Sequence, residues 1–246
     1  MTFKDYFSGH AAEYATYRPR YPAALFVWLA QQCEQHDRGW DCATGNGQAA
    51  IALADHFQQV MATDASAEQL QQAPAHPQVT YRVALAATSG LDAHSLDLVT
   101  VAQAVHWFDL ETFYREVKRV LKPRGVCAIW CYGRPRLASS TLDHHLTHYY
   151  NHTLDDFWTP ERRLVETGYR TLPFPFEELE TPAYTMQVDW TLTDLLGYLL
   201  TWSATQRFIR TRGFNPLEAL AEQLQADWRG DRATLSWPLT LRAGRT

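Results

Sequence analysis

The sequence predicts an α/β protein built on a doubly wound, mostly parallel sheet, and three observations support this prediction. Short apolar segments alternate with amphipathic segments from about residue 23 to residue 132. A glycine loop follows the first strand-like segment. Hydrophobic residues make up 46% of the 246-residue chain, which allows a sizeable core. Because crossovers between parallel strands are right-handed, this alternation places helices on both faces of one sheet.

The first half of the chain supplies the elements of this sheet in order. Apolar residues at helical spacing predict helices over residues 23–33, 47–57, 65–72 and 110–125, the last closing at Pro123 and Gly125. Short apolar runs predict strands from residue 40 and over residues 58–64, 78–84, 95–103 and 125–132. No marked helix is expected between the third and fourth strands, over residues 84–94.

The pattern changes after Arg134. A polar, helix-prone stretch covers residues 134–170, strand material covers 176–190, an apolar helix pair covers 191–208, an amphipathic helix covers 215–230, and a terminal strand covers 232–245. We expect this half to add closing strands and a helical cap. The chain is therefore predicted to be one domain over residues 1–246, with a core at about 35–132 and cap and closing-strand insertions at about 134–230.

Composition narrows the classes of partner. The net charge is −5, and no run of Lys or Arg exceeds a pair, which argues against a nucleic-acid partner. The longest apolar stretch, residues 23–30, is too short to span a membrane, and the first residues do not resemble a secretory signal. The four cysteines form no C-x-x-C pair. These features predict a cytoplasmic protein with a small-molecule substrate, and they leave its oligomeric state open.

The loop from Asp41 to Gly47 is the clearest sign of a ligand site. It follows a strand and opens a helix, where glycines allow a ligand to approach the backbone closely. Asp64 ends the next strand, 19 positions after Gly45, and its carboxylate suits the two hydroxyls of a ribose. The pattern predicts an adenosine-type ligand, with an ordinary strand-to-helix turn as the alternative. Asp41 favours S-adenosylmethionine over NAD, because a pyrophosphate needs positive potential at a helix N-terminus.

Five motifs occur in a fixed order along nearly the whole chain. They are F…Y…RP-x-YP in residues 7–22, D-x-x-x-G-x-G-Q at 41–48, AQAVHWFD at 102–109, L-x-x-x-G-x-x-A-x-W-x-Y at 121–132 and TWSA at 201–204. With these motifs the chain resembles the class I S-adenosylmethionine-dependent methyltransferases of the type 11 group, in particular the branch that includes trans-aconitate methyltransferase-like proteins.

The resemblance implies a Rossmann-like sheet of seven strands, S-adenosylmethionine as cofactor and S-adenosylhomocysteine as product. It places Asp64 at the ribose, residues 85–87 along the adenine, and Gln103 and His106 near the sulfonium. The cofactor-binding residues that it implies are Tyr14, Arg18, Asp41, Ala43, Gly45, Asn46, Gly47, Gln48, Asp64, Ala65, Leu85, Ala86, Ala87 and Gln103.

Two positions depart from the pattern of this family. Ala43 stands where the family usually has glycine, and its β-carbon costs about 1 kcal/mol if φ is positive there. Ala87 stands where the family usually has an acid that contacts the adenine. Both changes bear on cofactor affinity.

Methyl transfer from a sulfonium needs mainly alignment of donor and acceptor and exclusion of water. His106 is the candidate catalytic base, with an orienting pocket histidine as the equal alternative. Trp107 and Tyr14 suit a cation–π contact with the sulfonium, with core packing as the alternative. Tyr21, Trp107 and Trp202 are candidate substrate-binding residues. A carboxylate acceptor needs no base, whereas a hydroxyl acceptor can need one.

Two other functions compete with methyl transfer. The glycine spacing alone also suits an NAD-dependent oxidoreductase. Because Ala43 and Ala87 depart from the family pattern, they also suit a cofactor-binding module that has lost its activity.

His144, His148 and His152 are spaced by four, as metal ligands on a helix can be. Without an H-E-x-x-H motif we expect a solvated helix face there and no metal.

Overall fold

The computed structural model describes residues 18–246 and joins the strands of this region in one sheet. The spatial order is β3-β2-β1-β4-β5-β9-β6, and β7 and β8 also pair with β9. The first five strands run parallel to their neighbours, and β9 runs antiparallel to β5. The strands are β1 (Arg38–Cys42), β2 (Gln59–Asp64), β3 (Val79–Val83), β4 (Leu96–Ala102), β5 (Leu121–Tyr132), β6 (Arg136–Leu137), β7 (Glu177–Glu178), β8 (Tyr184–Trp190) and β9 (Ala233–Arg245).

This topology confirms the predicted doubly wound α/β fold. The chain order reverses at β1, because β2 and β3 lie on one side of it and β4 and β5 on the other. Ligands of open α/β sheets bind at the carboxyl ends of the strands beside such a reversal. The sheet has nine strands in the described region where seven were expected; β6 and β7 are two-residue pairings that leave no periodic signal in a sequence.

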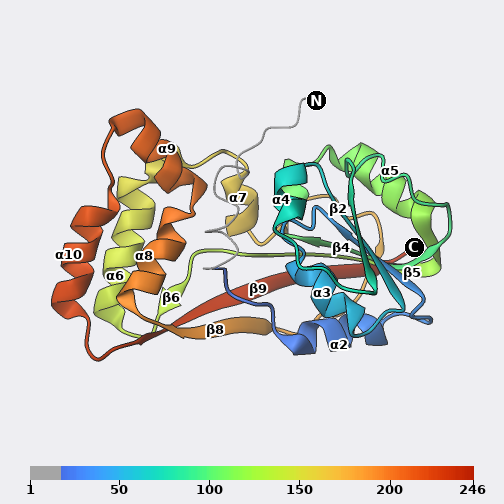
Figure 1. Ribbon diagram of the computed structural model, residues 1–246, viewed down its shortest axis with the longest axis horizontal. Helices are drawn as coiled ribbons and strands as arrows, with labels where there is room; N and C mark the ends of the chain where they lie inside the picture. Colours follow the sequence, from blue (N-terminus) through green and yellow to red (C-terminus); the bar gives the residue numbers. More distant parts are fainter. Residues whose placement is uncertain (1–17) are drawn as a thin grey trace.

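Helices cover both faces of the core sheet (Figure 1). Leu25 and Leu29 of α2 pack on one face with residues of α3, and Phe113 and Val117 of α5 pack on the other. Each helix is held by an apolar face rather than by its intrinsic propensity. These helices are α2 (Ala23–Gln31), α3 (Gln48–Ala54), α4 (Ala67–Gln71) and α5 (Leu110–Val120).

The end of α5 differs from the expectation. The helix stops at Val120, and β5 begins at the next residue instead of after Gly125. Leu121 already pairs with Leu96 of β4, and the register shifts before the next pair. Pro123 cannot donate to a helical ladder, so the chain enters the sheet early and passes the proline as part of an irregular strand.

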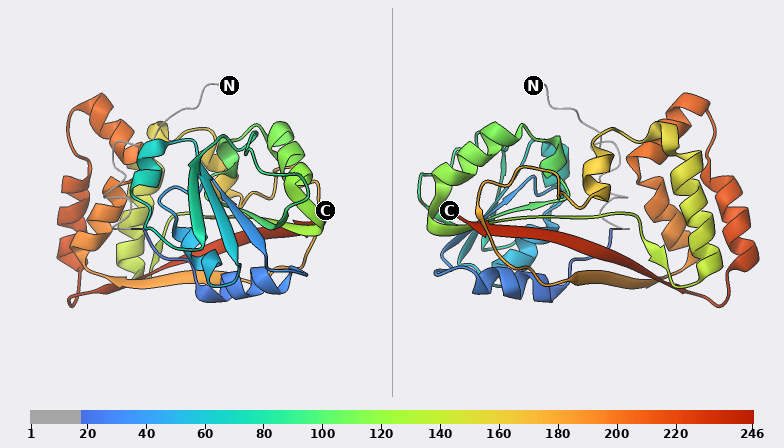
Figure 2. Two further views of the ribbon diagram at one scale, coloured as in Figure 1. Left: turned by 45° about the vertical axis from the view of Figure 1, so that its right-hand side comes forward. Right: turned by 180° about the vertical axis from the view of Figure 1, so that it is seen from behind.

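A long antiparallel ribbon connects the sheet to a helical cap. One end of β9 pairs with β5 and the other end with β8. The cap helices α6, α8 and α10 lie at the far end of this ribbon, as Figures 1 and 2 show. The elements of the cap region are α6 (Ser140–His148), η3 (Tyr149–Thr153), η4 (Asp155–Phe157), α7 (Arg162–Glu166), α8 (Leu192–Leu200), α9 (Ser203–Arg212) and α10 (Leu217–Asp227).

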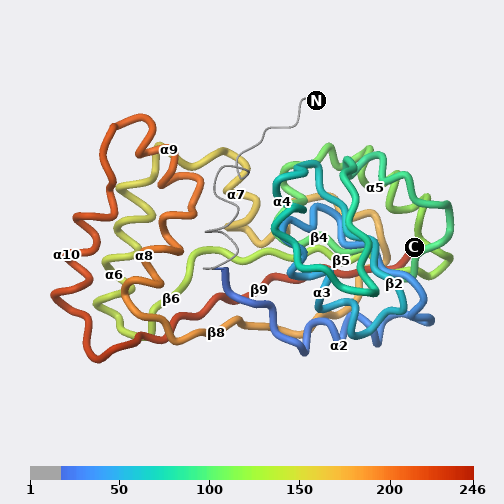
Figure 3. Tube along the Cα trace, viewed as in Figure 1, coloured from blue at the N-terminus to red at the C-terminus, as the bar shows by residue number. Residues whose placement is uncertain are grey.

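The cap and the core share one hydrophobic cluster, which contains Leu29 of α2 as well as Leu224 of α10 and Trp237 of β9. The chain trace in Figure 3 shows β5 and β9 running side by side through the molecule. Within residues 18–246, none of the helices combines the length and the apolar character that crossing a bilayer requires.

Candidate functional site

The glycine loop joins β1 to α3 in a left-handed backbone. Ala43, Gly45 and Gly47 have φ values of +55°, +57° and +81°. The nitrogen of Thr44 donates to the carbonyl of Thr63, and the nitrogen of Gly47 donates to that of Thr44. The backbone therefore turns tightly at the carboxyl end of β1. The φ of Ala43 is positive, so its β-carbon carries the steric cost considered above.

Gly47 has no room for a side chain. A β-carbon at this position would lie 2.5 Å from the hydroxyl oxygen of Tyr81, which reaches under the loop from β3. Gly47 is also the N-cap residue of α3. The glycine is required both by its φ and by this close approach.

Asp41 supports the loop from the inside. Its side chain is 1% exposed, and its carboxylate accepts hydrogen bonds from the hydroxyls of Thr44 and Thr100, the latter at 2.8 Å. Burial raises the pKa of Asp41 to about 6, and the two hydroxyls oppose this rise. In this arrangement Asp41 stabilises the shape of the loop through Thr44 and Thr100. From the sequence, the carboxylate of Asp41 was expected to face the ligand.

Asp64 joins the loop to the end of β2. Its carboxylate accepts hydrogen bonds from the nitrogens of Gly45 at 2.8 Å and Ser66 at 2.9 Å, and the residue is half-buried. Ala65 and Asn46, beside it and in the loop, are also half-buried. The structure thus brings together the acid and the glycine that the sequence separates by 19 positions.

Two further stretches border this edge of the sheet. Gln48 donates from its side-chain amide to the carbonyl of Pro19 at 3.2 Å, which ties the loop to the entering chain. Leu85 follows β3, is 55% exposed and begins a tight turn that also contains Ala86 and Ala87. An exposed leucine in this turn is a suitable surface for a flat apolar ring. No helix forms before β4, as expected.

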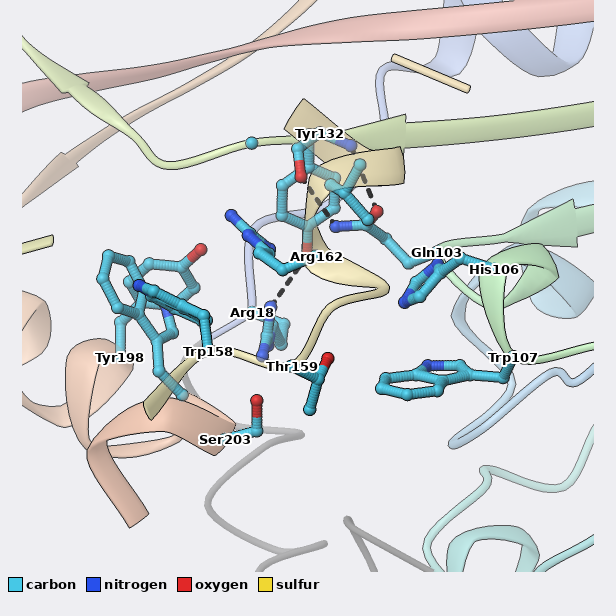
Figure 4. A pocket seen from close by; sticks show the side chains of 13 residues that line it. Arg18, Gln103, His106, Trp107, Tyr132, Trp158, Thr159, Arg162, Tyr198 and Ser203 are labelled. Carbon is cyan, nitrogen blue, oxygen red and sulfur yellow. Dashed lines mark hydrogen bonds between the residues drawn. The ribbon is translucent and has the colours of Figure 1, made fainter. Parts of the chain in front are cut away.

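A pocket opens between the carboxyl ends of β4 and β5 and the cap (Figure 4). Five Trp and Tyr side chains line it, together with two arginines and several neutral polar groups. The lining residues are Arg18, Gln103, His106, Trp107, Tyr132, Gly133, Trp158, Thr159, Arg162, Val165, Tyr198, Trp202 and Ser203.

Gln103 and Arg18 are both anchored to Tyr132. Gln103 has a φ of +57°, and its side-chain amide donates to the carbonyl of Tyr132 at 2.9 Å and accepts from its nitrogen at 3.2 Å. Arg18 donates to the hydroxyl of Tyr132 at 3.2 Å, and its guanidinium lies 5.2 Å from the ring centre of Tyr198. Figure 4 shows these bonds converging on Tyr132.

Arg162 enters the pocket from α7. Its guanidinium lies 4.9 Å from the ring centre of Trp158 and donates through Nε to the hydroxyl of Tyr150 at 2.7 Å. That hydroxyl donates in turn to Glu166 at 2.6 Å. The aromatic face and the hydroxyl fix the guanidinium at the wall of the pocket, and no hydrogen bond occupies its two terminal nitrogens within residues 18–246.

His106 lies in the short helix η2 (Val105–Trp107) and points into the pocket (Figure 4). Its Nδ1 lies 2.7 Å from the hydroxyl of Tyr169. Burial, aided by the positive charge of Arg162, lowers the pKa of His106 to about 3. The imidazole is therefore uncharged at neutral pH and is a weak proton acceptor.

The site residues predicted outside the glycine loop and the ends of β2 and β3 fall into three groups. Arg18, Gln103, His106, Trp107 and Trp202 line the pocket. Tyr21 does not; its ring packs edge-on against Trp130 at 5.5 Å, behind the wall, because the entering chain turns into the core there. Tyr14 lies outside the described residues.

Several pocket residues were missed by sequence reasoning. Arg162, Trp158 and Tyr198 come from cap segments that look like ordinary helices and loops in the sequence. The available signal was the high aromatic content of the chain, 13% with nine tryptophans.

The histidines of α6 and η3 make ring contacts or pair with a carboxylate. His148 and His152 lie with ring centres 4.7 Å apart, and His145 pairs with Asp227. The described part of the chain contains no group of three or more His, Cys, Asp or Glu side chains arranged to hold a metal ion.

Comparison with known proteins adds three findings. A family model described as "Methyltransferase domain" matches residues 40–129. A protein of Dictyostelium discoideum named as a methyltransferase is 32% identical over 225 residues, which are 90% of this chain and 86% of that protein. The structure of a type II methyltransferase from Anaeromyxobacter dehalogenans is 43% identical, with a TM-score of 0.87 over 93% of this chain and 97% of that one.

A more distant structure shares the fold alone. Phosphoethanolamine N-methyltransferase 2 of Haemonchus contortus, in complex with phosphomonomethylethanolamine and S-adenosylhomocysteine, is 16% identical with a TM-score of 0.50. The match covers 100% of this chain and 60% of that protein.

Proposed function

This chain belongs to the class I S-adenosylmethionine-dependent methyltransferases, and we propose that it methylates the carboxylate of a small organic acid bound between His106 and Arg162. The observation that carries the proposal is the charge of the pocket. Among its lining residues from the described part of the chain, two are arginines and none is an Asp or Glu. Such a pocket favours an anion and disfavours an ammonium group.

The residues at the edge of the sheet fit the cofactor. The loop of Gly45, Asn46, Gly47 and Gln48 leaves no room for a β-carbon at Gly47, and we assign it to the methionyl part, with Arg18 and Gln103 beside it. Asp64 and Ala65 are assigned to the ribose, and residues 85–87 to the adenine. Tyr14 is kept as a candidate from the sequence. When bound, S-adenosylmethionine supplies a methyl group on a positively charged sulfur, and S-adenosylhomocysteine is the product.

The acceptor needs little chemical help from the protein. An ionised carboxylate has no proton to remove, so its oxygen forms the new bond to carbon while the bond from carbon to sulfur breaks. The positive charge of the sulfonium and the negative charge of the carboxylate both disappear in this step. His106, with its pKa lowered to about 3, is poorly suited to remove a proton from a hydroxyl acceptor.

The protein contributes alignment and a dry pocket. Arg162 is held at a fixed angle by Trp158 and Tyr150, so its terminal nitrogens can orient a carboxylate with two parallel hydrogen bonds. Trp107 and Trp202 cover the remaining wall and limit access of water. Good alignment can contribute up to about 7–11 kcal/mol to lowering a barrier.

Methyl transfer from radiolabelled S-adenosylmethionine to parallel panels of acids, phenols and amines tests the proposal. We expect turnover with acids. Arg162→Gln should raise the KM for the acid about 10-fold to 100-fold, because a charge-assisted hydrogen bond contributes about 1.5–3 kcal/mol. Arg163→Gln, on the exposed side of the same helix, is the matched control and should leave KM unchanged. Turnover of phenols or amines alone, or an unaffected Arg162→Gln enzyme, would refute the carboxylate assignment.

A further inference from the structure

Tyr169 stands directly behind the pocket in an unusual backbone. It is 1% exposed and has a φ of +59°, and Gly168 before it has a φ of +62°. A β-carbon at Gly168 would lie 2.7 Å from the side-chain oxygen of Thr240. Two consecutive left-handed residues reverse the chain just after α7 and turn the tyrosine inward. Left-handed backbone at a non-glycine residue is unfavourable, and it often marks a functional position.

The surrounding structure holds this turn firmly. The nitrogen of Tyr169 donates to the carbonyl of Leu164 at 2.8 Å. Arg242, on β9, donates to the carbonyls of Tyr169 at 2.9 Å and Leu172 at 2.8 Å. The ring of Tyr169 is therefore placed by contacts from two separate elements, and its hydroxyl has a fixed position relative to His106.

The available hydrogen-bond partners determine which atom, the Tyr169 hydroxyl or His106 Nδ1, donates the hydrogen bond between them. The hydroxyl oxygen lies 2.7 Å from Nδ1, and within residues 18–246 it has no other hydrogen-bond partner. If Nδ1 carried the hydrogen and donated, the hydroxyl hydrogen of Tyr169 would be buried without an acceptor, which is unfavourable. If Tyr169 donates to Nδ1, both groups are satisfied. The imidazole hydrogen then resides on Nε2, on the pocket side of the ring.

We infer that Tyr169 is a positioning residue that fixes His106 in the tautomer with its hydrogen on Nε2, so that His106 donates a hydrogen bond to the acceptor oxygen instead of removing a proton. The role toward the acceptor rests on the proposed function, whereas the tautomer does not. Together with Arg162, this N–H forms a second donor aimed at an anionic acceptor. The lowered pKa of His106 agrees with an imidazole that stays neutral while it donates.

The tautomer is measured directly by nitrogen-15 NMR of the histidine side chains, in the protein without added ligands. The signal of His106 is identified as the one lost in His106→Gln. We expect a protonated Nε2 and an unprotonated Nδ1. In Tyr169→Phe the signal of the unprotonated Nδ1 should move downfield, because this nitrogen no longer accepts a hydrogen bond. Tyr114→Phe removes a buried hydroxyl that has no hydrogen-bond partner in the described region, and it should leave the signal unchanged. A protonated Nδ1 in the unmodified protein overturns the inference.

Kinetics test the role of the donor. The side chain of Gln keeps an N–H donor but cannot act as a base. His106→Gln should therefore stay within about 10-fold of the unmodified enzyme, whereas His106→Ala should raise the KM for the acid further. A loss of about 10²-fold to 10⁴-fold in both variants would indicate a general base and overturn the inference. Tyr169→Phe should raise the acceptor KM without changing affinity for S-adenosylmethionine. If the unmodified protein shows no turnover, the proposed function fails, and the NMR measurement still decides the tautomer.

Discussion

At the scale of single residues, three of the five non-glycine residues with a left-handed backbone in the described region lie at or near the candidate site. Ala43 lies in the glycine loop, Gln103 ends β4 and Tyr169 stands behind the pocket, and all three have φ values between +55° and +59°. A left-handed conformation costs a residue with a β-carbon about 1–2 kcal/mol. These conformations place a loop or a side chain at the pocket or at the carboxyl end of β1.

Ala43→Gly should stabilise the protein by about 1 kcal/mol, because glycine adopts a positive φ without the steric cost of a β-carbon. The melting temperature should rise by about 2–4 °C, measured by circular dichroism. Ala52→Gly is the matched control inside α3, and it should lower stability by about 0.5–1 kcal/mol. Equal losses of stability in both variants would show that the backbone at Ala43 is not strained.

Asp41 should make stability depend on pH. Its pKa is raised by burial to about 6 from 3.8, so its favourable contribution is complete below pH 4 and is lost as pH rises through 6. Asp41→Asn removes this titration. Between pH 4 and pH 7, the free energy of unfolding of the unmodified protein should therefore fall by about 3 kcal/mol relative to that of the variant, measured by urea unfolding. A constant difference across this range would contradict the raised pKa.

At the scale of elements, two glycines with the same backbone have different roles. Gly47 is the N-cap of α3 with a φ of +81°, and Gly213 is the C-cap of α9 with a φ of +79°. A β-carbon at Gly47 would meet Tyr81, whereas nothing lies within 4 Å at Gly213. The comparison separates the cost of the dihedral angle from the cost of the close approach.

Gly213→Ala should lose about 1–2 kcal/mol of stability and keep its response to cofactor. Gly47→Ala should lose more, because the loop or Tyr81 must also move. It should also show little thermal stabilisation by S-adenosylmethionine. Thermal unfolding with and without the cofactor measures both effects. Equal cofactor-induced shifts in the two variants would contradict the assignment of the loop to the cofactor.

At the scale of the whole molecule, β9 ties the cap to the core. It pairs with β5 at one end and with β8 at the other, and one hydrophobic cluster runs through both regions. The protein should therefore unfold in a single calorimetric transition, with the calorimetric and van't Hoff enthalpies equal. Two resolved transitions would show that the cap is an independent unit.

The parts of the fold that follow from local chemistry could be predicted from the sequence. Alternating segments predicted the doubly wound sheet, and Gly45, Gly47 and Asp64 marked the edge where the loop and the acid meet. The cap side of the pocket could not be predicted in this way. Arg162 and Tyr169 lie more than fifty residues after His106, and tertiary packing brings them near it, because Val165 of α7 and Tyr169 share a hydrophobic cluster with β5.

Single-residue roles were also hard to assign. Asp41 was expected to face the ligand, but its carboxylate turns inward to Thr44 and Thr100, because the strand end places it beneath the loop. Tyr21 was expected at the substrate, yet it packs against Trp130. A motif fixes which residues occur near a site, whereas the direction of each side chain depends on tertiary packing.

Calorimetric titration with S-adenosylmethionine, S-adenosylhomocysteine and NAD in parallel tests the central claim most directly. We predict dissociation constants of about micromolar size for the first two, corresponding to about −8 kcal/mol, and no response to NAD. Binding of NAD without binding of S-adenosylmethionine would contradict the claim and point to an oxidoreductase. No binding of any of the three would contradict it as well and point to a module that has lost its cofactor.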